Sequence, residues 1–277
     1  MEKYSLKTMK IYNLVKSTGY TMIKILDTTF ITNKNYFKNK VMHNLFFSNI
    51  KYDYIIEVGS KKISHFYKSS KKIYSHHYDY ESFLENKIQK LKNNKKYALF
   101  LDENLIFHPD LVLNKRKKLV SNINYKSELI KFFENYKKNF KLDLKIAAHP
   151  TTKIKHFGKF KLYKKKTLQL VKNAEIIFVH SSTSLSFPIL YKKKIIFITT
   201  NEINRTIQKK QIYDRAKFFK REPINISDKF NLKKIQKNTI NYSIKYNKFI
   251  DYFLKHPKSK QKKFGDTFFH MLNNKLN

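Results

Sequence analysis

The sequence predicts an α/β protein with parallel strands, and three observations support that prediction. Between residues 96 and 200, short apolar runs alternate with stretches whose apolar residues recur at helical spacing. The apolar runs are nearly continuous, as expected of strands that helices cover on both faces. Two of these runs lead directly into polar clusters, His149-Pro150 and His180-Ser181-Ser182-Thr183-Ser184. Polar side chains at the carboxyl ends of strands mark the ligand sites of open α/β sheets.

The N-terminal part of the chain is expected to form a small α/β unit over residues 1–95. Two strands are predicted there, Tyr54 to Ser60 and Lys72 to Tyr74, because both runs contain β-branched and aromatic residues. Tyr80 to Leu91 repeats apolar side chains at helical spacing, which predicts an amphipathic helix.

A second domain is expected over residues 96–224, in the order β-α-β-α-β-α-β. Its strands are predicted at Tyr97 to Leu101, Leu142 to Ala148, Glu175 to Val179 and Lys194 to Thr199. Its helices are predicted at Lys126 to Phe140, Thr167 to Lys172 and Ser184 to Leu190. Strands that alternate with helices imply a parallel sheet with right-handed crossovers.

The rest of the chain is expected to be basic and helical. A basic loop is predicted between Ala148 and Thr167. Helices are expected over residues 225–277, with one long helix from Ile235 to Leu254.

The charge of the chain requires an explanation of its own, because 59 Lys and Arg stand against 20 Asp and Glu, a net charge of +39. Such a charge favours nucleic-acid binding through counterion release, and a basic nucleic-acid-binding protein is one alternative. Arg is preferred for bidentate contacts with phosphate and guanine. The chain contains only four of them, Arg116, Arg205, Arg215 and Arg221. We therefore assign most of the lysine excess to the codon bias of an AT-rich genome, and nucleic acid is not the expected partner.

Several kinds of site and of targeting segment are excluded by what the sequence lacks. Without cysteine the chain forms no disulfide and no thiolate metal site. Four glycines cannot supply a Gly-rich phosphate loop. Met1 to Lys24 contains no apolar run long enough for a signal peptide or a membrane span. We expect a cytoplasmic protein that its positive field holds peripherally at the anionic inner face of the membrane. His76, His77 and Asp79 lack a further ligand at suitable spacing, so neither a metal nor another cofactor is expected.

The two polar clusters are candidate donor-binding residues. His149 can donate to a phosphate oxygen, and Pro150 stiffens the turn that aims it; the alternative is a histidine that only caps the strand. His180, Ser181, Ser182, Thr183 and Ser184 offer hydroxyls and first-turn N–H groups to an anion. N-capping needs only one of these residues, so we favour ligand binding over capping alone.

Acidic residues follow a third strand. Asp102 and Glu103 come directly after Tyr97 to Leu101, and a carboxylate there can deprotonate an acceptor hydroxyl, although a solvated acidic turn is the simpler reading. His108 and Asp110 lie close by in the sequence and are accessory candidates. Lys166, in a basic run between the two polar clusters, is a candidate contact to a diphosphate or a carboxylate.

Taken together, these motifs resemble bacterial surface-polysaccharide glycosyltransferases of the GT-B type. They are similar, more narrowly, to the group that includes bacterial sialyltransferases and polysialyltransferases. The resemblance covers about residues 96 to 200. It rests on the following segments: Phe100-Leu101-Asp102-Glu103-Asn104, Ala147-Ala148-His149-Pro150, Leu170 to Glu175, His180 to Ser184 and Phe187-Pro188-Ile189-Leu190.

The resemblance implies two Rossmann-like domains, the N-terminal one small or incomplete, and a reaction with a CMP-activated acidic sugar. Asp102 or Glu103 would be the base, and His149 would contact the donor phosphate. Ser181, Ser182 and Thr183 would bind phosphate or the sugar carboxylate. Asn104 stands where the acidic motif of the family often has Gly. The partners implied are a nucleotide sugar and a glycan or glycolipid acceptor, and the short N-terminal part keeps a non-catalytic relative that acts as a scaffold as an alternative.

Overall fold

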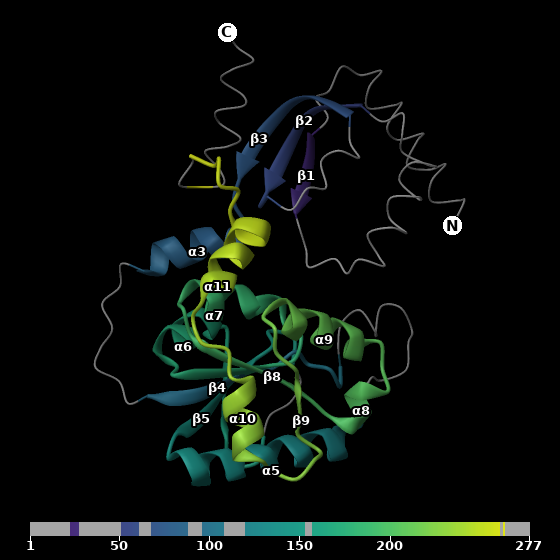
Figure 1. Cartoon of the computed structure of the whole chain (residues 1–277), viewed down its shortest axis with the longest axis vertical. Coiled ribbons are helices and arrows are strands. Elements are labelled where there is room, and N and C mark those ends of the chain that lie inside the picture. Colours follow the sequence, from purple (N-terminus) through teal and green to yellow (C-terminus); the bar gives the residue numbers. More distant parts are fainter. Residues whose placement is uncertain are drawn as a thin grey trace. The chain divides into compact units, whose positions relative to one another are not determined.

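The computed structural model describes residues 23–27, 51–60, 68–87, 96–107, 120–152, 157–260 and 263. It divides into two compact units, which Figure 1 shows as ribbons. The first unit combines Met1–Ser82 with Asn247–Asn277, and the second is the continuous segment Phe83–Tyr246. The division expected from the sequence falls instead after residues 95 and 224.

The first unit contains a sheet of three parallel strands in the order β1-β2-β3. These are β1 (Ile23–Asp27), β2 (Lys51–Val58) and β3 (Lys68–Ser75). Ile55 and Ile56 of the central strand are completely buried, as the apolar run predicts. Helix α3 (Tyr78–Lys87) follows β3. The sequence did not predict β1, because its run Ile-Lys-Ile-Leu-Asp is short and interrupted by charge.

The segment 247–260, far in sequence from the three strands, belongs to the first unit as well. It contains the second half of α11 (Ile244–Phe249) and a π-helical turn, η3 (Ile250–Leu254). The backbone N–H of His77 donates to the carbonyl of Leu254 at 2.7 Å, and the N–H of Ser60 donates to Asp251 at the same distance. Gly59 has φ +80, and a Cβ there would lie 2.3 Å from the carbonyl oxygen of Tyr252. Only glycine permits both this conformation and this approach.

The second unit is built on six parallel strands in the order β6-β5-β4-β7-β8-β9. They are β4 (Tyr97–Leu101), β5 (Asp143–Ala148), β6 (Lys161–Lys164), β7 (Ile176–Val179), β8 (Lys194–Thr199) and β9 (Ile224–Asn225). Numbered by their succession along the chain, the strands lie in the order 3-2-1-4-5-6, which is the doubly wound order of dinucleotide-binding folds. The prediction of an α/β fold with parallel sheets is confirmed.

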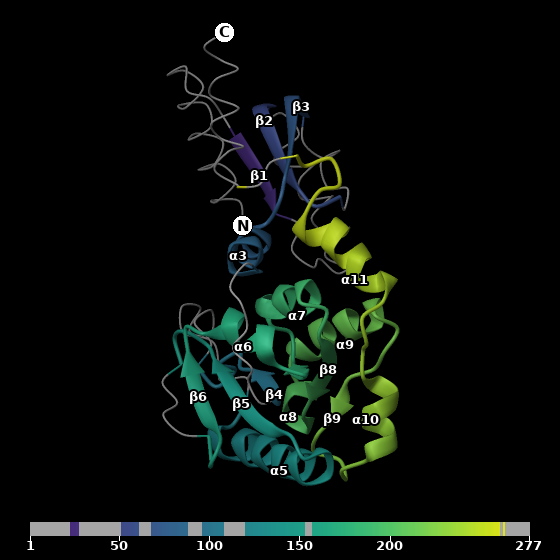
Figure 2. The ribbon, with the colours of Figure 1, turned by 90° about the vertical axis from the view of Figure 1, so that its left-hand side faces the viewer.

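Helices cover both faces of this sheet. They are α5 (Asn122–Phe140), α6 (Thr167–Asn173), η2 (Thr183–Leu185), α7 (Ser186–Leu190), α8 (Asn201–Asn204), α9 (Gln208–Phe218) and α10 (Leu232–Asn238). Figure 2 shows α5 along one side of the sheet and α6 and α7 along the other. Ser121 caps α5 by accepting the N–H of Asn124 at 3.2 Å, so this helix begins at Asn122, before the start predicted at Lys126, and ends at Phe140 as predicted.

Aromatic side chains from α5 and the central strands form the core of the second unit. Phe133 of α5 packs against Phe100 of β4 and Phe178 of β7, with ring centroids 5.3 and 5.9 Å away. All three rings are completely buried. Aromatic pairs at these distances add to the stability that burial of their apolar area provides.

Two sequence expectations for the second half of the chain are wrong. The basic loop before α6 contains strand β6, in which Lys161 and Lys164 flank Leu162 and Tyr163, and no local pattern signals its pairing with β5. The long helix expected over Ile235 to Leu254 ends at Asn238. It ends because the backbone N–H and C=O of Ile240 both form hydrogen bonds with Ile195 of β8, at 2.8 and 3.0 Å. A residue inside a helix uses these two groups for bonds within the helix.

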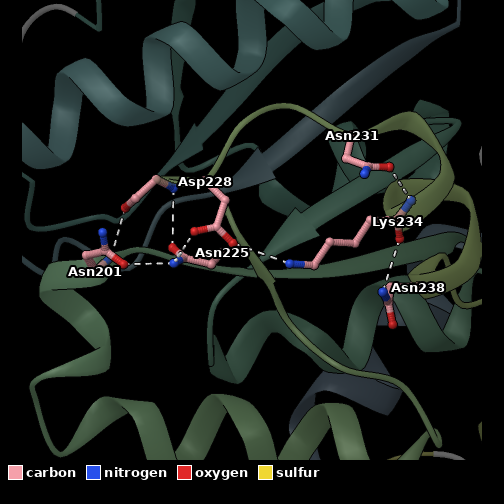
Figure 3. A network of polar contacts seen from close by, with 7 residues as sticks. Asn201, Asn225, Asp228, Asn231, Lys234 and Asn238 are labelled. Carbon is pink, nitrogen blue, oxygen red and sulfur yellow. Dashed lines mark hydrogen bonds and ion pairs between the residues drawn. The ribbon is translucent and has the colours of Figure 1, made fainter.

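A polar network fastens the short edge strand β9, and Figure 3 shows it from close by. The Asn225 amide donates to Asn201 of α8 at 2.8 Å and to Asp228 at 3.0 Å. Lys234 of α10 lies 3.4 Å from the other oxygen of Asp228. Asn231 caps α10 by accepting the N–H of Lys234 at 2.9 Å. A strand of two residues is thus held between two helices by side chains.

Candidate functional site

In open sheets of this strand order, ligands bind in the crevice outside the carboxyl ends of the strands at the switch point, which here are β4 and β7. The chain leaves β4 toward β5 on one side and leaves β7 toward β8 on the other, so these neighbouring strands form the topological switch point. Asp102 and Glu103 follow β4, and His180 follows β7. His149 follows β5, which pairs with β4. The structure therefore brings the three predicted motifs to one edge of one sheet.

The carboxylate of Asp102 is held by two backbone N–H groups, one after β4 and one after β5. Its carboxylate accepts the N–H of Asn104 at 3.1 Å and the N–H of His149 at 3.4 Å. Only 5% of Asp102 is exposed, and this burial raises the pKa of its carboxyl group, while the two N–H groups oppose the rise. Asp102 thus links the end of β4 to the end of β5.

Asn104 makes the turn that follows the acidic pair. Its φ is +53, in the left-handed region that Gly favours and that Asn tolerates better than most residues. Its side-chain amide donates to the carbonyl of Phe107 at 3.0 Å. Thr152 donates to the Asn104 side-chain oxygen at 3.4 Å. The side chain of Asn104 therefore stabilises the left-handed turn that its own backbone makes.

Glu103 bridges the two strands of the switch point. The backbone N–H of Ser181 donates to one of its carboxylate oxygens, and the Ser181 hydroxyl donates to the other at 2.9 Å. Burial raises the pKa of Glu103 to about 7, and the Arg215 guanidinium and the Ser181 hydrogen bonds oppose this rise. A carboxyl group with this pKa exchanges its proton near neutral pH.

Arg215 is a site residue that the sequence analysis missed. It lies on α9, and its guanidinium donates to the carbonyl of Ser182 at 3.0 Å. Burial lowers the pKa of Arg215 and the charge of Glu103 opposes this shift, so the two groups act on each other. One signal was available: Arg215 is one of only four arginines among 59 basic residues. Arginine in a lysine-rich chain marks positions where a planar guanidinium is needed.

His180 lies in the core rather than at the surface of the crevice. It is completely buried, and its Nδ1 lies 2.7 Å from the carbonyl oxygen of Ile198. A carbonyl only accepts, so Nδ1 donates and Nε2 accepts the Tyr125 hydroxyl at 2.9 Å. Burial lowers the pKa of His180 to about 4, so its ring is neutral at physiological pH. Both ring nitrogens are engaged within the chain, which leaves them no hydrogen bond for a ligand.

Two of the serines after His180 are engaged within the chain, one of them as a cap. Ser182 caps η2, because its hydroxyl accepts the N–H of Ser184 at 3.2 Å. Ser181 holds Glu103, whereas Thr183 is exposed and Ser184 is partly exposed. Thr183 and Ser184 are therefore the hydroxyl residues of this cluster that solvent reaches best.

The remaining candidates lie at the neighbouring strand end or outside the described residues. His149 is partly exposed, with Nδ1 2.8 Å from the Thr151 hydroxyl, and Pro150 is exposed. Lys166 is exposed at the start of α6. His108 and Asp110 lie outside the residues that the structure describes.

Comparisons with known proteins place this geometry among weakly similar folds. No family model and no curated protein matches the chain. Among solved structures it is similar to KpsC of Thermosulfurimonas dismutans, a β Kdo 2,4 transferase, at 11% identity and a TM-score of 0.26 over 40% of this chain and 36% of that chain. It is also similar to the wall teichoic acid polymerase TagF, H444N variant, at 15% identity and a TM-score of 0.44 over 91% and 65% of the two chains.

A third similar structure is the UDP-GlcNAc 2-epimerase of Methanocaldococcus jannaschii in complex with UDP-GlcNAc and UDP. The identity is 13% and the TM-score 0.37, over 87% of this chain and 78% of that chain. The chain spans less than two thirds of the length of KpsC and of TagF. Likenesses of this strength carry no conclusion about activity, so the function has to follow from the site.

Two further observations concern the described residues only. No group of three or more His, Cys, Asp and Glu among them is arranged to hold a metal ion. His76 lies 3.8 Å from Glu81 and His77 lies 3.7 Å from Asp79, as separate pairs. Within the same residues, no helix has both the length and the apolar composition needed to cross a membrane.

Proposed function

We propose that the chain is a GT-B-type glycosyltransferase that moves a sugar from a nucleotide donor to a glycan acceptor during the synthesis of a cell-surface polysaccharide. The observation that carries this proposal is Glu103, a buried carboxyl group at the switch point with its pKa raised to about 7. Crevices at such switch points hold nucleotides, and a carboxylate there suits proton removal from a hydroxyl group.

Glu103 is the proposed base, and Asp102 its support. In the reaction, the acceptor hydroxyl loses its proton to Glu103 while its oxygen forms the new bond to the anomeric carbon of the donor sugar. The bond from that carbon to the nucleotide phosphate breaks, and its electron pair leaves with the phosphate. Ser181 occupies one direction at each Glu103 oxygen, and a carboxylate has about four lone-pair sites, so room remains for the acceptor proton. Asp102 is committed to two backbone N–H groups.

The leaving nucleotide is assigned to the exposed residues of the same edge. His149, Thr183 and Ser184 present an imidazole and two hydroxyls that solvent reaches. Donors placed where charge develops on the phosphate lower the barrier by roughly 3 kcal/mol each. Three buried residues of the cluster position the site and are not assigned to the nucleotide. Ser181 fixes Glu103, Ser182 fixes the turn of η2, and His180 fixes the end of β7. Pro150 and Lys166 border the site.

The donor class that we propose first is a CMP-activated acidic sugar similar to sialic acid. This finer assignment rests on the resemblance of the acidic, His-Pro and Ser-rich motifs. The net charge of +39 supports it only in part, because a positive field attracts any anionic donor. UDP-sugars are therefore the comparison donors in every assay.

The test combines donor binding with turnover in matched variants. CMP-sialic acid and UDP-GlcNAc are titrated into the protein, and nucleotide release is measured with a panel of glycan acceptors. Glu103→Gln should reduce turnover about 10²- to 10⁴-fold, because it removes a proton acceptor. Glu134→Gln, which neutralises an exposed carboxylate on α5, is the control and should leave turnover unchanged. If neither CMP nor UDP binds, and His149→Ala changes nothing in any assay, the proposal is lost.

Peripheral membrane association is a second part of the proposal, and it rests on charge alone. An excess of 39 positive charges is attracted to anionic lipid surfaces. Cosedimentation with vesicles of phosphatidylserine and phosphatidylcholine should exceed that with phosphatidylcholine alone and should fall as salt is added. Equal sedimentation with both vesicles would remove this part and leave the transferase proposal intact.

A further inference from the structure

A basic pocket lies on the second unit at the opposite edge of the sheet from Glu103. Its lining comes from α9, from the loop that enters β9 and from α10. Arg221 and Glu222 stand just before the first residue of β9, and Asn238 is the last residue of α10. Ile240, two residues later, pairs with Ile195 near the start of β8. These positions put the pocket at the amino ends of β8 and β9, whereas the proposed donor site lies at carboxyl ends.

The pocket has the size of a small-molecule site, with a volume of about 620 Å³. Four of the side chains that line it are cationic and two are acidic. The cations are Lys217, Lys220, Arg221 and Lys237, and the acids are Asp214 and Glu222. A bare phosphate or sulfate would fill only a small part of this volume, so the size of the pocket favours a larger anion.

A turn at the end of α9 fixes two of the cations. Lys220 has φ +57, and the N–H of Arg221 donates to the carbonyl of Ala216 at 3.1 Å, which is the Schellman arrangement. The Arg221 guanidinium also donates to the carbonyl of Lys220 at 2.9 Å. The backbone of Lys220 and Arg221 is therefore already ordered in the free protein. Part of the entropy cost of binding a ligand is met before the ligand binds.

The wall formed by α10 is fixed as well. The Asn238 side chain accepts the N–H of Glu222 at 3.1 Å and donates to the carbonyl of Lys234 at 3.1 Å. Figure 3 shows Asn238 and Lys234 joined in this way. Asn238 thus ties the last turn of α10 to the loop before β9, and the two sides of the pocket are held together.

Three lysines of the pocket are available to pair with an anionic ligand. Within the described part of the chain, Lys217, Lys220 and Lys237 form no ion pair with a carboxylate. Asp214 is already paired with Lys210, at 2.6 Å. The cations lie in the last turns of α9 and α10 or just beyond, where the helix dipole favours positive charge, so four of them can gather without a bound anion.

The mixture of groups points to a particular ligand chemistry. Arg221 can bind a carboxylate or a phosphate in a bidentate manner. Glu222 and Asp214 would repel a polyphosphate, yet their oxygens accept hydrogen bonds from hydroxyl groups. Tyr213 is 38% exposed and offers a ring to a sugar face. We propose that this pocket binds an anionic saccharide, a sugar that carries carboxylate or phosphate together with free hydroxyls.

The experiment measures binding by isothermal titration, so its result does not depend on whether the crevice at Glu103 transfers a sugar. The probes are trigalacturonate, glucose 6-phosphate and neutral maltotriose. Both anionic sugars should bind, whereas maltotriose should not. Tighter binding of trigalacturonate assigns the pocket to a carboxylated glycan segment, and tighter binding of glucose 6-phosphate assigns it to a phosphorylated sugar.

Matched variants separate the pocket from the general charge of the protein. Lys217→Gln with Lys237→Gln should weaken binding of the anionic probes by about tenfold or more. Lys131→Gln with Lys138→Gln removes the same charge from exposed positions on α5 and should have little effect. Arg221→Lys keeps the charge and should still weaken binding, because the bidentate geometry is lost. Equal binding by the pocket variant and the α5 variant, or maltotriose binding as tightly as trigalacturonate, overturns the proposal.

Discussion

The two edges of the six-stranded sheet differ in the burial and the pairing of their charged side chains. At the carboxyl edge, Asp102 and Glu103 are buried, and partners from neighbouring strands hold each carboxylate. At the amino edge, Lys217, Lys220 and Lys237 are exposed, and no carboxylate of the described residues pairs with them. Buried charges depend on a few specific neighbours, so single substitutions should have large effects there. Exposed charges act together through solvent, so single substitutions should matter little.

The largest expected effect on stability tests the burial of Glu103. Its pKa in the folded protein is about 7, above the usual value of 4.5, so the folded protein holds this proton more tightly than the unfolded chain does. This contribution to stability is complete below pH 4.5 and is lost as the pH rises to about 7. Between pH 5 and pH 8 the native protein should therefore lose stability relative to Glu103→Gln, on the order of 3 kcal/mol.

Urea unfolding of both proteins at the two pH values measures this difference. Glu134→Gln serves as the control, because that carboxylate is exposed on α5 and its removal should leave the pH dependence unchanged. Parallel pH profiles for the native protein and Glu103→Gln would mean that Glu103 is not buried as described.

An intermediate effect on stability is expected for the buried hydrogen bond between Tyr125 and His180. Tyr125→Phe removes the hydroxyl that donates to Nε2 of His180 and leaves a buried acceptor without a partner. The free energy of unfolding should fall by about 1–3 kcal/mol. Tyr213→Phe, at an exposed ring of α9, is the matched control and should change stability by less than about 0.5 kcal/mol. Equal stability of the two variants would show that the buried pair contributes nothing.

The smallest effect is expected at the amino edge. Lys217→Gln with Lys237→Gln should change the free energy of unfolding by less than about 0.5 kcal/mol, because both side chains are exposed and no acidic side chain in the described part of the chain pairs with them. The change should shrink further in high salt. Thermal unfolding at low and high salt measures it, and a loss as large as that of Tyr125→Phe would abolish the contrast between the edges.

The strands that the sequence located most accurately are those whose pattern is local. Tyr97–Leu101 and Lys194–Thr199 were predicted to the residue, because each is an apolar run between polar turns. Strand β6 was missed because only Leu162 and Tyr163 lie between its two lysines, and β9 was missed because two residues form no pattern. Both exist through pairing with a neighbouring strand, which is information from distant parts of the chain.

The site shows the same division between local and distant information. The sequence placed Asp102, His149 and Ser181 at strand ends, and the alternation of strands and helices was enough to put those ends on one edge. It did not reveal the hydrogen bond of Ser181 to Glu103 or the position of Arg215, because these contacts join residues far apart in the chain. His180 was considered as a ligand or a cap, and its role between Ile198 and Tyr125 required the packed structure.

The way in which the first unit is completed has a consequence for the order of folding during synthesis. Ser60, Ser75 and His77 have backbone partners in Asp251, His256 and Leu254, which are synthesised after the whole of the second unit. The second unit is continuous from Phe83 to Tyr246, so all of its strands have been synthesised before those partners appear. The segments of the second unit can therefore come together before the first unit has all of its residues.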